Sequence, residues 1–311
     1  MADITLKQLE YLLAAAEAGS VTGAAAKLYL SQSAVSTALA DLEQSLGAQL
    51  FVRHPRGMSL TAVGQEVVAD SRRIIMGVEE MHESARTSVE SIAGKLRVGC
   101  YSSLAPVLLP MVIDEFLRRH PRVELSFLEG NQQTLADSLA SGALDLIIVY
   151  DYQLHELRQS GAFAMTRVYA SRPYVILPVD HPLAERRRVS LRELAPEPMI
   201  LFDLAPGGEY FLSFFQLEGL EPTVRFQTTS FEMVRALVAR GLGYSILSQR
   251  TAISMSYEGL QVATREIAAD IPPLGIATVH LARAKPTLRV RAFMEQVENS
   301  LAQFATMHDL G

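Results

Sequence analysis

The sequence predicts an α/β protein in three parts: a small helical unit, one long helix, and a larger domain of alternating strands and helices. Three observations support this. Residues 6–64 hold three short helical patterns and a basic turn, residues 62–92 carry an apolar repeat without proline, and strand and helix patterns alternate from residue 95 onward. With 311 residues, the chain is long enough for two or three domains.

The N-terminal stretch is typical of a helix-turn-helix followed by a wing. Leucines at helical spacing predict a first helix over residues 6–18, and a second is expected over 22–28. Ser31 is placed to cap a third helix over 32–46, and Gly47 is placed to end it. In such a motif the last helix lies in the major groove of DNA.

Two groups of residues in this unit are candidates for DNA contact. Short polar side chains begin the third helix, on faces that its apolar stripe leaves free. The basic turn at 53–57 lies between two short extended pieces, as in a wing whose cations meet phosphates or the minor groove. The alternative is an ordinary solvated surface. The predicted DNA-binding residues are Ser31, Gln32, Ser33, Ser36, Thr37, Arg53 and Arg56.

The charge of this unit does not favour DNA binding. The whole chain has a formal net charge of −6, and residues 1–65 hold four Lys and Arg against five Asp and Glu. A basic surface is the usual footprint of a DNA-binding domain. The motif therefore requires that its few cations face the DNA, or that several copies bind together.

The long helix expected from residue 62 carries a heptad pattern. Thr61 is placed to cap it, with a phosphate contact as the alternative role. The spacing favours a two-helix seam with a second copy of the chain, and the alternative is an amphipathic helix packed on its own domain. The predicted seam residues are Val67, Ser71, Ile74, Val78, Met81, Ala85, Ser88 and Ile92.

From residue 95 the alternation of strand and helix patterns predicts βαβ units and a parallel sheet. A second series of such units begins near Tyr169. The predicted strands are 95–100, 123–129, 144–149, 174–178, 200–202, 223–227, 244–247 and 276–281. The predicted helices are 104–119, 132–141, 209–218, 231–240 and 287–304.

Polar and aromatic residues at the ends of these strands predict a ligand site, because open α/β sheets bind ligands at the carboxyl edge. Hydroxyl residues there begin two helices, whose free N–H groups favour an anion such as a carboxylate. Asp203 weakens the carboxylate prediction, and the alternative is that the hydroxyls are only caps. The predicted ligand-binding residues are Ser102, Ser103, Asn131, Gln132, Tyr150, Phe202, Thr229 and Ser230.

Other classes of site find little support. The sequence has no CxxC, no phosphate loop, no GxSxG and no His pair at metal-ligand spacing, so we expect no metal, no cofactor and no enzyme. Cys100 is the one cysteine and is expected to be a small buried side chain; as an oxidant sensor it would lack a resolving partner. No signal peptide or membrane-length apolar run is found, which predicts a cytoplasmic protein without a membrane partner.

Two sets of strings carry a family resemblance. The first set is LKQLEYLLAAAEAGSVTGAAAKL, LSQSAVSTALADLEQSLGAQLFVR and SLTAVGQEV, and the second is LAPVLLPMVIDEFLRRHPRVEL, LASGALDLIIV, DHPLA and VRALVARGLGYSIL. From end to end the chain resembles the LysR-type transcriptional regulators. The resemblance implies a winged helix-turn-helix, a dimerising linker helix, and an effector domain of two α/β lobes like that of periplasmic solute-binding proteins. It also implies that strands cross between the lobes near 165–171 and 264–271.

The expected organisation follows from the resemblance. The DNA-binding domain would be 1–61, the linker helix 62–93, and the effector domain 94–311, with lobe one at 95–166 plus 271–304 and lobe two at 170–266. The implied partners are an operator in double-stranded DNA, a small-molecule effector, a second copy through the linker helix and a tetramer beyond it, and RNA polymerase if the protein activates transcription. An enzyme and a solute carrier are the competing functions.

The third helix departs from the family pattern. Ser33 stands where the family usually has proline after the opening Gln, and Ser36, Thr37 and Ala38 stand where it usually has an arginine. Without arginine this helix cannot make the bidentate guanine contact. Base reading would then depend on Gln32 and its serine and threonine neighbours, or on DNA shape.

Overall fold

The computed structural model describes residues 4–55, 57–85, 92–154, 161–251, 253–282 and 285–308. Two predicted residues, Arg56 of the wing and Ser88 of the seam, lie outside these ranges. The chain divides into two compact units. The N-terminal unit comprises residues 1–91 with 137–145, and the C-terminal unit comprises 92–136 with 146–311.

The helices of the N-terminal unit begin and end at local signals. The Ser20 hydroxyl accepts from the Gly23 N–H at 3.1 Å, and Ser31 accepts from the Ala34 N–H at 3.2 Å. The predicted ends of the first and third helices are confirmed, with Gly47 in the left-handed conformation after the third. The elements are α1 Leu6–Ala18, α2 Val21–Leu28, α3 Gln32–Leu46, β1 Phe51–His54, β2 Gly57–Leu60 and α4 Ala62–Ala85.

The wing is held against the turn between α1 and α2. Strands β1 and β2 pair antiparallel, and the Met58 N–H donates to the Gly19 carbonyl at 2.9 Å. Gly57 has φ +135°, and a Cβ there would lie 2.5 Å from the Gly19 oxygen, so this position requires glycine. Buried leucines and alanines of α1, α2 and α3 form a core with Leu50 and with Val68 of α4.

The C-terminal unit contains two main sheets. The five-stranded sheet has the order β4-β3-β5-β13-β6, and the four-stranded sheet has the order β11-β7-β12-β8; β9 and β10 form a parallel pair. The strands are β3 Ala93–Tyr101, β4 Arg122–Gly130, β5 Leu146–Tyr150, β6 Phe163–Ser171, β7 Tyr174–Pro178, β8 Arg188–Val189, β9 Pro198–Phe202, β10 Thr223–Thr228, β11 Ser245–Leu247, β12 Val262–Ile267 and β13 Leu274–Leu281. The helices are α5 Ala105–Arg119, α6 Gln132–Ala140, the short η1 Pro182–Glu185, α8 Leu191–Leu194, α9 Gly207–Leu217, α10 Phe231–Ala239 and α11 Leu288–His308.

The prediction of a parallel sheet is wrong in part. Strand β3 is parallel to β4 and β5, but β13 is antiparallel to both β5 and β6, and β7 is antiparallel to β11 and β12. The chain passes between the sheets from β6 to β7 and returns from β12 to β13. This return reverses the direction of the strand that enters the first sheet. The sequence pattern of alternating elements contains no signal for that reversal.

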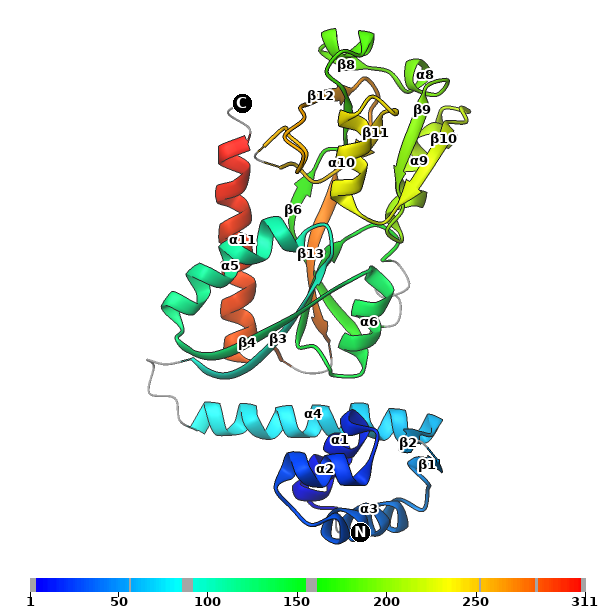
Figure 1. The fold of residues 1–311 in the computed structure, drawn as a ribbon. Coiled ribbons are helices and arrows are strands. Elements are labelled where there is room, and N and C mark those ends of the chain that lie inside the picture. The colour runs from blue at the N-terminus through cyan, green and yellow to red at the C-terminus, as the bar shows by residue number, and fades with distance from the viewer. Residues whose placement is uncertain are drawn as a thin grey trace. The chain divides into compact units, whose positions relative to one another are not determined.

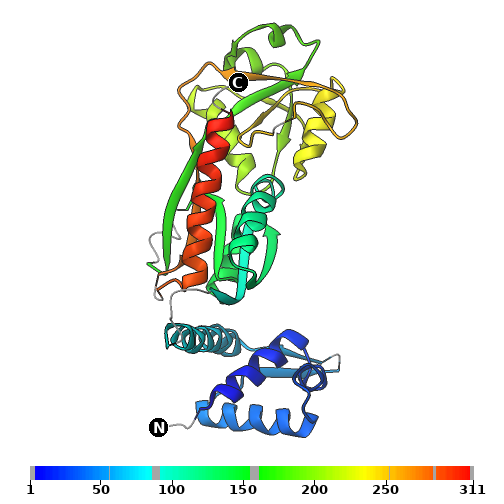
Figure 2. The ribbon, with the colours of Figure 1, turned by 90° about the vertical axis from the view of Figure 1, so that its left-hand side faces the viewer.

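Helices α5 and α11 lie side by side against the five-stranded sheet (Figures 1 and 2). Phe116 of α5 meets Phe293 of α11 edge to face, with ring centroids 5.0 Å apart. Strand β5 is buried along its whole length, as its apolar sequence predicts. Because β3 and β5 are neighbouring parallel strands, Tyr101 and Tyr150 at their carboxyl ends come together, and this brings two predicted strand-end segments to one place.

Candidate functional sites

The start of α3 presents a polar surface. Ser31, Gln32, Ser33 and Thr37 are exposed, and Ser36 is half-buried, while the apolar stripe of the helix faces the core. The Ser31 hydroxyl is already engaged, since it caps the helix and lies 3.1 Å from the Ser33 hydroxyl. The side chains of Gln32 and Thr37 are therefore the better placed to contact bases.

Tyr29 was not predicted as a candidate. It lies in the turn before α3, at φ 57°, and its side chain is 97% exposed. A left-handed conformation is uncommon for an aromatic residue, and here it ends α2. The sequence signal was the break after Leu28, which shows that a turn exists but not that a tyrosine projects from it.

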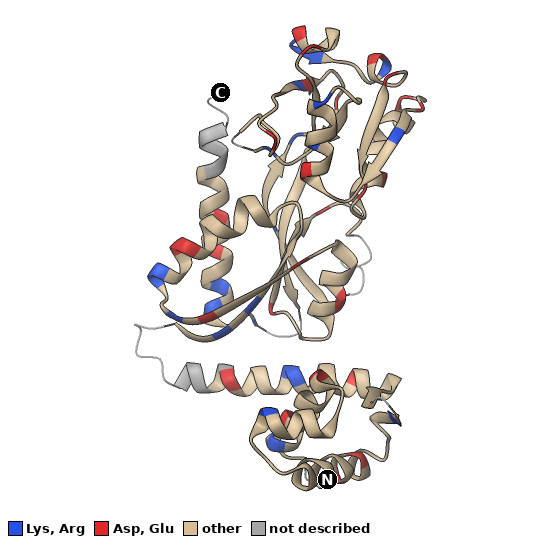
Figure 3. Cartoon of the chain, viewed as in Figure 1, with Lys and Arg blue, Asp and Glu red and all other residues tan. Residues whose placement is uncertain are grey.

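Positive charge on the N-terminal unit is sparse, as Figure 3 shows, and α3 carries no Lys or Arg. Lys27 of α2 is paired with Glu17 of α1. The Glu43 carboxylate accepts from the Leu50 and Phe51 N–H groups at 2.7 and 3.2 Å, so it holds the end of α3 against β1. Arg53 is exposed on β1, and no ion pair to it is found in the described part of the chain.

Helix α4 has two different apolar faces. Val68 is buried in the core of the N-terminal unit, and Val67 packs against that core, as the alternative of a helix packed on its own domain requires. Ser71 is buried within the chain, with its hydroxyl donating to the Val67 carbonyl at 2.7 Å, so it cannot be a seam residue. Ile74 and Met81 are 50% and 61% exposed.

Two other predictions about α4 have definite outcomes. The Thr61 hydroxyl accepts from the Gly64 N–H at 2.9 Å and donates to the Gln49 carbonyl at 2.8 Å, so its role as a cap is confirmed. Ile92 lies outside any helix, directly before β3, and the predicted heptad cannot extend to it. Any seam through α4 would thus be shorter than the sequence repeat indicated.

In the C-terminal unit, a small cavity lies where the ends of β3, β5 and β9 meet the starts of α9 and α10. We call it the aromatic cavity. Its volume is about 20 Å³, room for about one water-sized group. Tyr101 and Tyr150 meet edge to face at 5.4 Å, and Phe202 and Phe231 at 6.0 Å. Its walls are mainly Tyr101, Tyr150, Tyr152, Phe202, Tyr210 and Phe231.

The hydroxyls of this cavity are held in their neutral form. The Tyr101 hydroxyl donates to the Leu204 carbonyl at 2.5 Å, and the Tyr150 side chain is hydrogen-bonded to Ser103. Burial raises the pKa of both phenols well above the usual range, and the Asp203 carboxylate adds to the increase at Tyr101. Both tyrosines are therefore uncharged at neutral pH.

A wider space, the open groove, adjoins the aromatic cavity and has a volume of about 770 Å³. Five of the predicted ligand-binding residues line it, and Ser103 and Phe202 line both spaces. Tyr150 lines the aromatic cavity. The predicted residues in the open groove are Ser102, Ser103, Phe202, Thr229 and Ser230.

Asn131 and Gln132 line neither space. The Asn131 side-chain oxygen accepts from the Thr134 N–H at 2.9 Å at the start of α6, which is a cap. Gln132 is buried, and its amide donates to the Tyr152 carbonyl at 3.0 Å. Both side chains therefore support the structure around the strand ends.

The serines predicted to begin the first helix lie before it. Helix α5 begins at Ala105 with Leu104 as its cap residue, and no side chain caps it, so the alternative that these serines are caps is wrong here. The Ser102 N–H is used, because it donates to the Gly130 carbonyl at 3.0 Å. At the second helix the alternative prediction, that a hydroxyl residue is a cap, is confirmed. The Ser230 hydroxyl accepts from the Met233 N–H at 3.3 Å and so caps α10.

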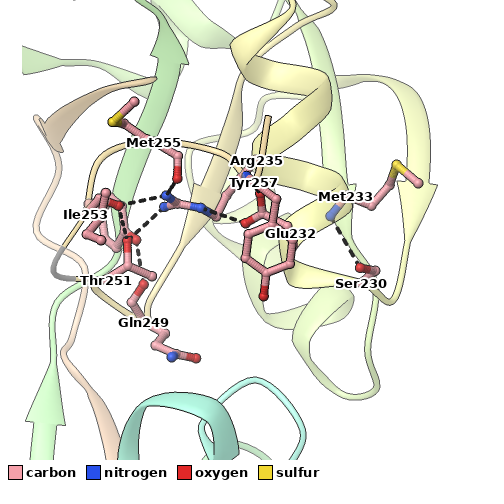
Figure 4. Close-up of polar contacts among 10 residues, drawn as sticks. Ser230, Glu232, Met233, Arg235, Gln249, Thr251, Ile253, Met255 and Tyr257 are labelled. Carbon is pink, nitrogen blue, oxygen red and sulfur yellow. Dashed lines mark hydrogen bonds and ion pairs between the residues drawn. The ribbon is translucent and has the colours of Figure 1, made fainter. Parts of the chain in front are cut away.

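A buried arginine on the wall of the open groove was not predicted. Arg235 of α10 pairs with Glu232 at 3.1 Å and donates to the Thr251 hydroxyl and the Ile253 carbonyl, both at 2.8 Å, and to the Met255 carbonyl (Figure 4). These contacts hold the segment after β11 against α10. Because the guanidinium is fully engaged, it is a support for the groove wall rather than an open cation.

Cys100 is buried, as the sequence predicted, and its thiol pKa is raised by burial and, to a smaller extent, by the Glu129 carboxylate. A thiol held in this state is a weak nucleophile. Within the residues that the structure describes, no group of three His, Cys, Asp or Glu residues is placed to hold a metal, and no helix is long and apolar enough to cross a bilayer.

Comparisons with known proteins agree with this organisation. The family described as "Bacterial regulatory helix-turn-helix protein, lysR family" matches residues 6–65, and "LysR substrate binding domain" matches residues 90–302. The HTH-type transcriptional regulator CysB of Burkholderia cenocepacia is 33% identical over 235 residues, which cover 74% of this chain and 72% of that protein.

Solved structures give the same result. HinK, a LysR family transcriptional regulator from Pseudomonas aeruginosa, is 35% identical with a TM-score of 0.64, over 96% of this chain and 99% of that one. A full-length OxyR from the same organism is 26% identical with a TM-score of 0.75, over 96% and 97% of the two chains.

The fold and its two candidate sites define a class: a helix-turn-helix protein that carries a two-sheet substrate-binding domain. The match of both family descriptions over most of the chain then identifies the family. The chain belongs to the LysR family of bacterial transcriptional regulators.

Proposed function

We propose that this regulator binds operator DNA through α3 and the wing, and that a small organic molecule in the open groove changes this binding. The observation that carries the proposal is the open groove itself: about 770 Å³, lined by hydroxyl and aromatic side chains at the carboxyl ends of strands. A ligand there contacts segments from both sheets, so it can prefer one arrangement of them.

Fewer observations bear on the chemical class of this molecule. The hydroxyls of Ser102 and Thr229 and the N-terminus of α10 favour a carboxylate. Against it, the Ser102 N–H is already used and Arg235 is engaged with Glu232. A carboxylate is therefore one candidate class, to be compared directly with neutral molecules.

For DNA we propose Gln32, Ser33, Ser36 and Thr37 as groove contacts, with Ser31 as the cap that fixes them, and Arg53 and Arg56 as phosphate contacts. Tyr29 is added because its exposed hydroxyl stands beside this surface. The low positive charge of one unit supports binding as a dimer joined through α4, and as a tetramer of two dimers. RNA polymerase is a further partner if the protein activates transcription.

We propose the following division of the chain: residues 1–61 bind DNA, 62–93 join two copies, and 94–311 bind the effector. Within the effector domain, lobe one is 95–166 with 271–304 and lobe two is 170–266. The placement of β7, β11 and β12 in one sheet, and of β3, β4, β5 and β13 in the other, supports the two lobes. Limited proteolysis followed by mass spectrometry tests the boundaries.

The function is tested in two assays on the full chain. A thermal-shift screen of metabolites finds molecules that bind the native state, because such molecules raise Tm. Gel shifts with the upstream DNA of the regulator's own gene then show whether a hit alters binding. The double variant Ser103→Ala with Thr229→Ala should lose the response to the hit and keep operator binding. Loss of DNA binding alone would mean that these residues serve the fold.

A further inference from the structure

Two buried polar side chains between the cavities have an atom without a hydrogen-bond partner among the described residues: Ser248 through its hydroxyl and Gln249 through its side-chain oxygen. Ser248 is 4% exposed and Gln249 is 8% exposed. Burying a polar atom without a partner is unfavourable, so most such atoms in native proteins are hydrogen-bonded. The two side chains thus form an unsatisfied polar pair next to the candidate ligand site.

The position of this pair connects the two spaces. Both residues line the aromatic cavity, and Gln249 also lines the open groove. Figure 4 shows Gln249 below the segment that Arg235 holds. A molecule in the open groove can therefore reach the pair with one polar group, while its larger part remains in the groove. The aromatic cavity, at about 20 Å³, admits only a group of about one or two heavy atoms.

The surroundings favour a neutral group. Among the described residues, no Lys, Arg or His lines the aromatic cavity. Two carboxylates act on its walls, Asp203 on Tyr101 and Asp151 on Tyr210, in the direction that disfavours a further negative charge. Arg250, the cation next to Gln249 in sequence, lies 4.9 Å over the Tyr174 ring and lines a neighbouring cavity that Ser248 and Gln249 also border, but it does not line the aromatic cavity. An anion in the aromatic cavity would have no compensating charge.

We propose that Ser248 and Gln249 form the polar end of the effector site, and that the effector is a neutral aromatic molecule bearing a carboxamide or hydroxyl group. This inference rests on the proposed function and names its ligand class. A carboxamide both donates and accepts, as the Gln249 amide and the Ser248 hydroxyl do. The aromatic body packs against Phe202 and Phe231, which line both spaces.

The pair is also connected to the passage between the sheets. The Ser171 hydroxyl donates to the Ser248 carbonyl at 2.5 Å, and the Tyr174 hydroxyl donates to the Gln249 carbonyl at 2.5 Å. Ser171 ends β6 and Tyr174 begins β7, so these two bonds join the ligand-contacting segment to the point where the chain crosses from one sheet to the other. A ligand bonded to this segment acts directly on that crossing.

The test compares three molecules of nearly equal shape on the full-length protein: benzamide, benzoate and ethylbenzene. Dissociation constants are measured by ligand-observed NMR. We expect benzamide to bind about tenfold more tightly than ethylbenzene, because one net hydrogen bond to a buried partner corresponds to roughly that factor. We expect benzoate to bind more weakly than benzamide, because its charge would be uncompensated. In Gln249→Met the preference for benzamide over ethylbenzene should disappear, while ethylbenzene should bind unchanged. Gln216→Met, an exposed glutamine of α9, is the matched control and should behave as the wild type.

Three results would each overturn the proposal. Benzoate could bind at least as tightly as benzamide, benzamide could fail to bind, or Gln249→Met could retain the preference for benzamide over ethylbenzene. If Gln249→Met does not fold, Ser248→Ala replaces it with the same expectation. The proposed function is separated by gel shift. If a charged metabolite alters operator binding equally in the wild type and in Gln249→Met, the proposed function is supported and this inference is contradicted. If the protein prefers benzamide but no ligand alters its binding to DNA, the ligand class is supported and the proposed function is contradicted.

Discussion

The two candidate sites of this chain are built in opposite ways. The side chains proposed to face DNA come mainly from one stretch of α3 and are mostly exposed. The groove-lining residues come from segments as far apart in sequence as Ser103 and Gln249, and many are buried. The Arg235 contacts are an extreme case, since one side chain holds a whole segment in place.

This difference determines how substitutions should behave. An exposed residue on one helix can be replaced with little effect on folding, so a change in function reports the contact itself. A buried residue at a convergence of segments couples function to stability, because its replacement leaves unpaired groups behind. Each prediction below tests this contrast between α3 and the groove.

The largest effect on stability is expected from Arg235→Met. The substitution removes the ion-pair partner of the largely buried Glu232 carboxylate and the hydrogen bonds from Arg235 to the carbonyls of Ile253 and Met255. Breaking a buried pair in this way costs about 3 kcal/mol or more. Chemical denaturation of the full chain measures it. The double variant Arg235→Met with Glu232→Gln should recover part of the loss. A change below about 0.5 kcal/mol would show that the groove wall does not depend on this contact.

The next effect concerns assembly. Ile74→Glu with Met81→Glu places like charges on the exposed apolar face of α4 without touching the buried Val68. We expect a smaller species in sedimentation velocity and weaker gel shifts, with Tm of the monomer nearly preserved because both positions are exposed. Glu66→Gln with Glu79→Gln on the same helix is the control. An unchanged mass would rule out a seam through this face.

A smaller and more specific effect separates the third helix from the wing. Gln32→Ala should change the ranking of operator variants, by about 1–3 kcal/mol for a good base contact. Arg53→Ala should weaken binding to all sequences alike and lower the salt slope by roughly one. Neither should alter the free energy of unfolding. If Arg53→Ala changed the sequence preference and Gln32→Ala did not, the two roles would be reversed.

The smallest effect at neutral pH comes from the buried tyrosines of the C-terminal unit. Burial raises the pKa of Tyr174 to about 12, whereas an unfolded tyrosine ionises near ~10. The folded form therefore keeps its full stability below pH ~10 and loses it as the pH rises toward ~12. Absorbance at 295 nm and circular dichroism, followed over this range, should change together. Tyr174→Phe should reduce the alkaline loss; an identical curve would contradict the assignment.

Much of the N-terminal unit was predictable, because its signals are local. The Ser31 hydroxyl and the N–H that it caps are three residues apart, and Gly47 ends α3 through its own left-handed backbone. Such contacts form within one turn of helix, whatever the rest of the chain does. For the same reason the Thr61 cap was foreseen correctly, while the burial of Ser71, which depends on the tertiary packing of α4, was not.

In the C-terminal unit, the sequence by itself determined most of the strands and helices, since apolar runs and helical spacing are properties of each segment. Strands β6 and β12 were expected only from the family resemblance, and β8 and α8 were not predicted. Only the tertiary structure decided in which direction each strand runs and which segments pack against one another. Strand β13 runs antiparallel because the chain returns from the other sheet, and Ser102 does not cap α5 because that helix begins only at Ala105, with Leu104 as its cap residue. Arg235 and Gln249 acquired their roles from contacts across many residues of sequence, and a contact of that kind depends on the path of the whole chain rather than on any local pattern.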